Sequence, residues 1–224
     1  MHKDTSLINL RYQSIYNRYF CNRNKNLERK CVMHYIIYMH PTKDSFNGQV
    51  LHTFEQALKQ TGNEKVYVRH LYESFTDVVL SNAEYEDSLK GLYAEDVQHE
   101  QQMLQEAKTV TFIFPIWWGG FPAIGKGYLD RVLSYGFAFE LEDETPIPKM
   151  NNKPLGLIYT TGSPEKEWNK AEKDDFEGIV KRSISDFCGF NMLKPLHLGY
   201  VVQASEDEHQ TMLQRVKEYA VQYE

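Results

Sequence analysis

The stretch that decides the fold of this 224-residue chain is Thr109-Val-Thr-Phe-Ile-Phe114, which is followed at once by Pro115. A short, unbroken and largely apolar run of this kind, bounded by proline, is typical of a parallel strand in the middle of a sheet that is covered on both faces. Other apolar runs precede and follow it, and segments of helical composition separate them. The sequence therefore predicts alternating strands and helices with this run at the centre of the sheet.

The alternation begins near Met33 and continues to the end of the chain. We expect strands at residues 35–39, 65–70, 109–114, 155–160 and 194–202. We expect helices at residues 46–60, 96–107, 123–134, 170–187 and 206–223. The acidic stretch 82–92 is irregular and is expected to be a loop. This order predicts the doubly wound α/β class, in which ligands bind at the carboxyl ends of the strands, so the loops that start at His40, Pro115 and Thr160 should converge.

The composition fits one globular domain over residues 33–224. Hydrophobic residues make up 42% of the chain and charged residues 25%, and no apolar run approaches the roughly 18 residues of a membrane span. The cysteines Cys21, Cys31 and Cys188 are odd in number and have neither metal-like nor disulfide-like spacing. We therefore expect a cytoplasmic protein with no metal site and no membrane insertion.

Residues 1–32 form a basic leader in front of an acidic body. They hold seven Lys or Arg residues against Asp4 and Glu28, although the whole chain has a net charge of −6. The acidic body would repel phosphates and the leader is too short for a binding domain, so no nucleic acid partner is expected. The leader has no helical or strand period, which predicts disorder, and a transit peptide is an alternative. We favour a start of translation at Met33, because residues 28–30 require purine-rich codons where a bacterial ribosome-binding site would lie.

The most specific motif begins with the last residue of the central run. It is Phe114-Pro-Ile-Trp-Trp-Gly-Gly-Phe-Pro-Ala-Ile-Gly-Lys-Gly-Tyr-Leu-Asp-Arg-Val-Leu-Ser-Tyr-Gly-Phe-Ala-Phe139. This motif resembles the FPxxWxxxPAxLKGxxDRVxxxGFAF pattern of the flavodoxin-like NAD(P)H:quinone oxidoreductases. Two further stretches, His40-Pro-x-x-x-Ser-Phe-Asn47 and Thr160-Thr-Gly-Ser163, are similar to that family's phosphate loop and second flavin loop, in the same chain order.

The resemblance covers most of residues 33–222 and has several implications. It implies a flavodoxin-like three-layer fold with a five-stranded parallel sheet in the order 2-1-3-4-5. It implies FMN or FAD as cofactor, NAD(P)H as co-substrate, a small-molecule electron acceptor and a homodimer. The choice between FMN and FAD, and between NADH and NADPH, stays open.

The phosphate loop precedes an expected helix start, where backbone N–H groups and the helix dipole favour an anion. Ser45 and Asn47 can add side-chain donors. By resemblance, Phe46 contributes a backbone N–H and His40 lies beside the phosphate. The alternative is that Asp44 or Ser45 only caps the helix.

The other two loops are expected to hold the flavin ring. Pro115, Ile116, Trp117 and Trp118 offer the flat apolar wall and backbone groups that an isoalloxazine requires. Trp118 matches the family's flavin-contacting tryptophan. For Trp117, the alternative is that its side chain packs in the core.

The loop of Thr160, Thr161, Gly162 and Ser163 ends a strand. By resemblance, Thr161 and Gly162 approach the pyrimidine end of the flavin, where small residues let the backbone come close to the ring. An ordinary glycine turn is the alternative.

No catalytic residue is assigned. Where some family members place a Tyr and a His for hydride and proton transfer, this chain has Trp168 and Asp174 in an ungapped alignment. Trp168, Phe137 and Phe139 are expected to line the substrate pocket, and by resemblance the last two border the pocket of the dimer mate. Core packing is the alternative for both phenylalanines.

The expected reaction is a ping-pong transfer of two electrons, with hydride passing from nicotinamide C4 to flavin N5 and then to a quinone or similar acceptor. One alternative is a one-electron shuttle of the flavodoxin type. The other is a regulatory subunit in peripheral contact with a potassium-efflux antiporter, since similar flavoproteins serve that role.

Overall fold

The computed structural model describes residues 33–60, 65–75, 77–168 and 170–223. Every prediction about residues 1–32 lies outside these residues. The central run forms β3 (Thr109–Pro115), all seven residues of which are buried. It pairs in parallel with β1 (Met33–Tyr38) and β6 (Lys153–Thr160), and β2 (Lys65–His70) lies outside β1. The predicted central position of this strand is confirmed.

The sheet departs from the expected order at its last position. The predicted strand 194–202 is replaced by two short strands, β7 (Phe190–Met192) and β8 (Leu196–Leu198), which both pair with β6. The order is therefore β2-β1-β3-β6 followed by β7 and β8, and within the described residues the sheet has six strands instead of the predicted five. The expected 2-1-3-4-5 order is right for the first four positions and wrong in treating the fifth as one strand.

The register explains why this edge is divided. Leu155 pairs with Met192, but Ile158 pairs with Leu196, so two residues of β6 face three residues of the edge. Such an extra residue interrupts the ladder as a bulge does. At the interruption the Leu157 amide donates to the Tyr219 hydroxyl at 3.2 Å instead of to a strand. A side chain from a distant helix thus satisfies the β6 backbone where the ladder is broken.

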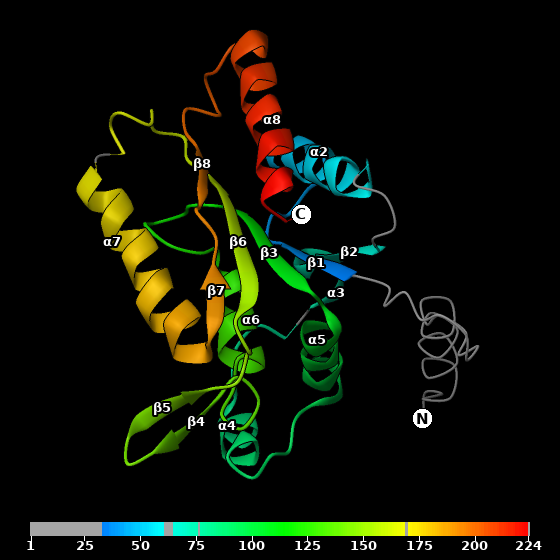
Figure 1. Cartoon of the computed structure of the whole chain (residues 1–224), viewed down its shortest axis with the longest axis vertical. Helices are drawn as coiled ribbons and strands as arrows, with labels where there is room; N and C mark the ends of the chain where they lie inside the picture. Colours follow the sequence, from blue (N-terminus) through cyan, green and yellow to red (C-terminus); the bar gives the residue numbers. More distant parts are fainter. Residues whose placement is uncertain (1–32, 61–64, 76, 169, 224) are drawn as a thin grey trace, which may run out of the picture. The chain divides into compact units, whose positions relative to one another are not determined.

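Helices cover both faces of the sheet, as predicted (Figure 1). On one face α2 (Phe46–Gln60) and α8 (Glu206–Ala220) pack against each other and share one apolar cluster with β1. On the other face a second cluster is formed with α5 (Glu95–Glu106), α6 (Ala123–Val132) and α7 (Lys170–Val180). The expected helix 170–187 continues from α7 as a π-helix, Lys181–Asp186, and Val221–Tyr223 follow α8 as a 3-10 turn. Among the described helices, none combines the length and apolarity that a membrane crossing requires.

Within the described residues, four further elements lie where the sequence predicted no helix or strand. α4 (Asn82–Ser88) lies in the stretch predicted to be irregular, and it begins with a capping box between Ser81 and Glu84. The segment after Phe139 forms a hairpin of β4 (Phe139–Glu142) and β5 (Thr145–Pro148), turned by Asp143 and Glu144 at positive φ. The short α3 (Leu71–Ser74) was also not expected.

Arg131 fastens α4 to the domain. Its guanidinium is buried near the end of α6 and donates to the Glu84 carboxylate at 2.6 and 2.9 Å. It also donates to Asp96 at 2.7 Å and to the Asp77 carbonyl at 2.6 Å. Arg131 therefore has a structural role, because its one side chain joins three separate segments.

Candidate functional site

The three loops expected to converge lie together at the carboxyl ends of β1, β3 and β6. The Ile116 amide donates to the Thr160 carbonyl at 2.8 Å, which joins the second loop to the third. The Asn47 side chain is buried and exchanges hydrogen bonds of 3.0 and 3.2 Å with the Thr160 hydroxyl. The His40 and Trp117 rings lie 6.1 Å apart. Asn47 therefore uses its side chain to tie the first loop to the third.

The start of α2 is capped by Ser45, not by Asp44. The Ser45 Oγ accepts a hydrogen bond from the Gly48 amide at 3.1 Å, so Ser45 makes the capping contact. Capping leaves the first two amides of the helix open: within the described residues, neither the Phe46 nor the Asn47 amide has a hydrogen-bond acceptor. Two aligned N–H groups at a helix start form the donor set that a phosphate requires.

His40 and Phe46 flank this helix start. The His40 Nδ1 lies 2.8 Å from the Thr42 carbonyl oxygen, 3.2 Å from the Thr42 amide nitrogen and 3.3 Å from the Ser45 Oγ, so the imidazole is part of the loop. The Phe46 ring turns away from the loop and stacks on His209 of α8, with ring centroids 4.2 Å apart. Phe46 can therefore offer the loop its backbone N–H, as expected by resemblance. His209 was not singled out in the sequence.

The second loop is a tight turn that carries its tryptophans outward. Amide and carbonyl groups of Trp117 and Gly120 exchange hydrogen bonds of 3.1 and 3.2 Å, while φ is +53° at Trp118 and +77° at Gly119. Positive φ at a residue other than glycine costs on the order of 1 kcal/mol or more. Trp118 is fully exposed and Trp117 is 40% exposed, so the core alternative for Trp117 is not realised. A strained turn with an uncovered aromatic ring favours contact with a ligand.

The third loop is fastened to β8 behind it. The Thr161 amide donates to the Leu198 carbonyl at 3.0 Å, and the Tyr200 amide donates to the Ser163 carbonyl at 2.9 Å. The Thr161 Oγ1 donates to the Ser163 carbonyl at 2.9 Å and lies 2.8 Å from the His197 Nε2. Burial lowers the pKa of His197 to about 4, so its imidazole is neutral near pH 7. His197 was missed in the sequence because a histidine in a short edge strand carries no distinguishing pattern.

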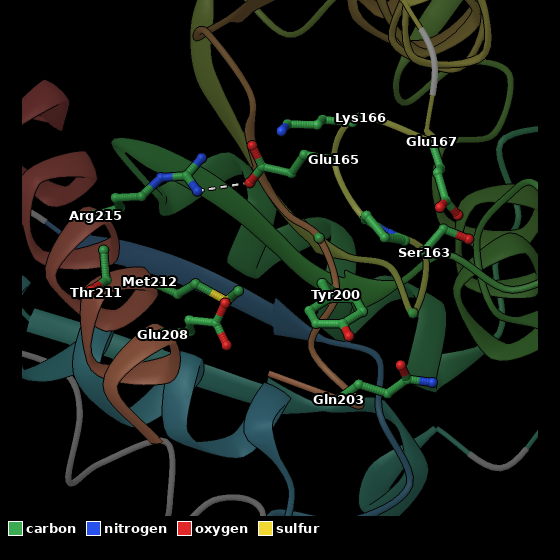
Figure 2. Close-up of a pocket in the computed structure, with 13 residues that line it drawn as sticks. Ser163, Glu165, Lys166, Glu167, Tyr200, Gln203, Glu208, Thr211, Met212 and Arg215 are labelled. Atoms are coloured by element: carbon green, nitrogen blue, oxygen red, sulfur yellow. Dashed lines mark hydrogen bonds and ion pairs between the residues drawn. The ribbon is translucent and has the colours of Figure 1, made fainter. Parts of the chain in front are cut away.

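A cavity of about 900 Å³ lies beside this loop (Figure 2). The segment 162–167 lines one side, and Thr211, Met212 and Arg215 of α8 line the other. Arg215 donates to the Glu165 carboxylate at 2.7 Å, and this pair joins the loop to the helix. Burial alone would raise the pKa of Glu165, but the hydrogen bond and charge of Arg215 hold it below its usual value.

The expected substrate-pocket residues do not come together within this chain. Phe137 is buried in the core, which matches its alternative. Phe139 packs on Phe187 at 4.6 Å, and both line an apolar groove of about 560 Å³ between α6 and α7 that reaches the turn at Gly119. Trp168 instead lies near His197, at 6.1 Å between ring centroids, and its buried Nε1 has no hydrogen-bond acceptor among the described residues.

A doubly wound parallel sheet with an open helix start, an outward aromatic turn and a glycine-containing loop at one edge is the arrangement with which α/β proteins bind phosphorylated ligands at their strand ends. Residues 33–221 match the family model described as flavodoxin-like fold, and the chain belongs to this family.

Known relatives agree with this assignment. The chain is 33% identical to an uncharacterized NAD(P)H oxidoreductase of Haemophilus influenzae over 172 residues, covering 74% of this chain and 85% of the relative. It is 33% identical to the ribosyldihydronicotinamide dehydrogenase [quinone] of Rattus norvegicus over 80% of this chain and 86% of that protein. The solved NAD(P)H:quinone oxidoreductase from Methanothermobacter marburgensis superposes with a TM-score of 0.76 at 25% identity, covering 87% of this chain and all of the other.

Proposed function

We propose that this chain is a flavin-dependent NAD(P)H oxidoreductase that reduces quinones or similar acceptors by two electrons. The observation that carries the proposal is the convergence of three loops, which place two open amides and an exposed tryptophan turn at one edge of the sheet. The relatives supply the reaction class, since two of those named above are quinone-dependent enzymes.

The first loop fits the phosphate of FMN or FAD. The Phe46 and Asn47 amides, the Ser45 hydroxyl and the His40 ring surround the helix start. A Cβ at Gly48 would lie 1.8 Å from the Lys43 carbonyl oxygen, so glycine is needed for the loop to fold this closely over the first turn of the helix. The loop is therefore a preformed cradle for an anion, and ordering it requires little further reorganisation on binding.

The second and third loops fit the flavin ring. Trp117 and Trp118 provide an apolar surface, and on the facing loop the Gly162 amide and carbonyl and the Ser163 amide have no hydrogen-bond partner among the described residues. When bound, the flavin accepts hydride from NAD(P)H and passes two electrons to the acceptor. The protein's residues bind, orient and shield the reactants. Trp168 and Asp174 replace the expected proton-transfer pair, and no side chain is assigned as an acid.

We also propose that the protein is a homodimer in the cytoplasm, and an apolar groove supports the dimer. The apolar groove lined by Phe139 and Phe187 is open at the surface, and the fully exposed Trp118 lies in the turn at its end. A second copy that covered the groove would remove these apolar groups from water, at about 25 cal/mol per Å². Sedimentation velocity tests the dimer. A peripheral contact with an antiporter is a separate proposal, which co-purification with membranes would test.

The decisive experiment follows the flavin directly. The purified protein is reconstituted with FMN and with FAD, and NADPH or NADH is then added without oxygen while absorbance near the flavin maximum is recorded. Rapid two-electron bleaching that a quinone reverses is the expected result. A protein that binds neither flavin would overturn the cofactor assignment and the proposed function with it.

A further inference from the structure

His197 lies directly behind the third loop, on the strand that supports it. Its side chain is 5% exposed, and its ring stacks on that of Tyr159 with centroids 4.8 Å apart and an interplanar angle of 12°. The Arg215 guanidinium donates to the His197 carbonyl at 2.9 Å, which fixes the backbone as well. Ring and backbone are thus both held, and the imidazole has one orientation toward the loop.

The hydrogen bonds around Thr161 give this imidazole a direction. The Thr161 hydroxyl carries one proton, and it donates that proton to the Ser163 carbonyl at 2.9 Å. The oxygen can then only accept from the His197 Nε2, which lies 2.8 Å away. The Nε2 nitrogen must therefore carry the proton of the neutral ring. A directed chain results, from the His197 N–H through the Thr161 hydroxyl to the Ser163 carbonyl.

The series of hydrogen bonds from His197 to Ser163 bridges Gly162, the loop residue that has no side chain. Gly162 lies between Thr161 and Ser163, and a Cβ there would touch only Val202, at 3.6 Å. Packing therefore leaves Gly162 free to move, and its flexible backbone is restrained by the hydrogen bonds on either side. On the outer side of the loop, Gly199 of the segment after β8 lets the chain approach closely, because a Cβ there would lie 2.8 Å from the Glu165 amide nitrogen.

We propose that His197 is a positioning residue for the cofactor: through Thr161 it fixes the backbone of Gly162 and Ser163 against the flavin ring and so sets flavin affinity and reduction potential. The inference rests on the proposed function, because it takes this loop as the flavin loop. Backbone groups aimed at a flavin ring tune its electronics, so a residue that fixes their direction acts on the potential without touching the ring.

The test separates the hydrogen bond from the stacking. His197→Phe keeps a ring against Tyr159 but removes the donor, whereas His197→Gln keeps an N–H at similar reach. We expect His197→Phe to weaken FMN binding roughly 3- to 10-fold and to shift the midpoint potential of the bound flavin, as loss of one buried hydrogen bond implies. His197→Gln should recover most of both. His52→Gln, on the exposed side of α2, is the matched control and should change neither.

A double-mutant cycle tests the route through the hydroxyl. Thr161→Val removes the oxygen that joins His197 to Ser163 while keeping the branched shape of the side chain. If the chain acts as one unit, His197→Phe combined with Thr161→Val should be no worse than either single variant. Additive losses, or an unchanged affinity and potential in His197→Phe, would contradict the inference while leaving the proposed function intact.

A measurement on the flavin-free protein tests the positioning role of His197 even if the protein does not bind flavin. Nitrogen-15 NMR should show His197 as the Nε2-protonated tautomer, and the Gly162 and Ser163 amides should gain exchange in Thr161→Val and in His197→Phe. The opposite tautomer, or exchange that neither variant changes, would overturn the positioning role. A wild-type protein with the expected tautomer and exchange but no flavin binding would instead contradict the proposed function, and with it the cofactor role of His197.

Discussion

The turn at Trp117–Gly120 and Arg131 of α6 come from one continuous motif, yet they lie in opposite environments. Trp118 is fully exposed on a backbone of positive φ. Arg131 is buried, and its guanidinium donates to two carboxylates and a carbonyl. A motif residue whose groups are all satisfied within the protein serves the fold, whereas one left uncovered at an energetic cost is available to a ligand.

The largest expected effect is on stability, and it concerns the fully hydrogen-bonded residue Arg131. Arg131→Ala leaves the carboxylates of Glu84 and Asp96 without their partner and should lower the free energy of unfolding by about 3 kcal/mol. Urea denaturation measures this. The exposed pair of Lys126 and Asp130 on the same helix supplies the control, since Lys126→Ala should cost less than about 0.5 kcal/mol. Equal effects of the two variants would break the comparison.

The next effect concerns His197, another satisfied group. Burial lowers its folded-state pKa to about 4, against an ordinary value of 6.5; the charges of Lys173 and Arg215 act in the same direction and that of Glu165 opposes them. The unfolded chain therefore binds this proton more readily. The contribution of His197 to stability is present above pH 6.5 and is lost as the pH falls toward 4, at up to about 1.4 kcal/mol per pH unit. Denaturation at several pH values should show a shallower slope in His197→Phe, and identical slopes would contradict burial of a neutral ring.

For the exposed Trp118, a substitution should lower activity without lowering stability. Trp118→Gly relieves the positive φ, so the free energy of unfolding should stay constant or rise by up to about 1 kcal/mol. The same change removes the exposed ring and should lower kcat/KM for a quinone roughly tenfold. Leu89→Ala, at another exposed apolar residue, should leave kcat/KM unchanged. A variant that is less stable and fully active would reverse the assignment of Trp118.

The smallest effects distinguish two neighbours in the phosphate loop. Ser45→Ala removes the cap of α2 and should lower stability by about 1 kcal/mol while weakening FMN binding. Asp44→Ala should stay within about 0.5 kcal/mol, because no hydrogen bond of the Asp44 carboxylate to a described residue supports the helix. Thermal unfolding with and without FMN measures both. Equal losses of stability in the two variants would indicate that Asp44 also caps α2.

The sequence predicted the parts of the fold that depend on local pattern. The apolar runs of β1, β3 and β6 and the three loops after them were located correctly, because burial on both faces produces continuous apolar runs. The divided edge could not be predicted, since it depends on the Tyr219 hydroxyl meeting the Leu157 amide across 62 positions. α4 had a usable signature in Ser81 and Glu84, but its acidic composition concealed it.

For the candidate site, the sequence located the loops but not the contacts of every side chain. The open Phe46 amide and the exposed Trp118 ring are available for the contacts that the resemblance implies, and those contacts stay predictions. The Asn47 side chain hydrogen-bonds to Thr160, Trp168 lies near His197, and Phe139 packs on Phe187. The sequence could not predict these positions, because each depends on contacts with residues that are distant along the chain. His197 became visible only when the strand placed it behind Thr161.

The divided edge of the sheet has a consequence for aggregation. A long, regular edge strand offers consecutive unpaired N–H and C=O groups to another chain. Here that edge consists of two strands of three residues each, interrupted by a segment that contains Pro195, which has no N–H to donate. At the opposite edge, β2 begins with the charged residue Lys65, and Arg69 of the same strand pairs with the buried Glu100 at 2.7 Å. Both ends of the sheet thus resist addition of a foreign strand, which protects the folded protein from growing into β-linked polymers.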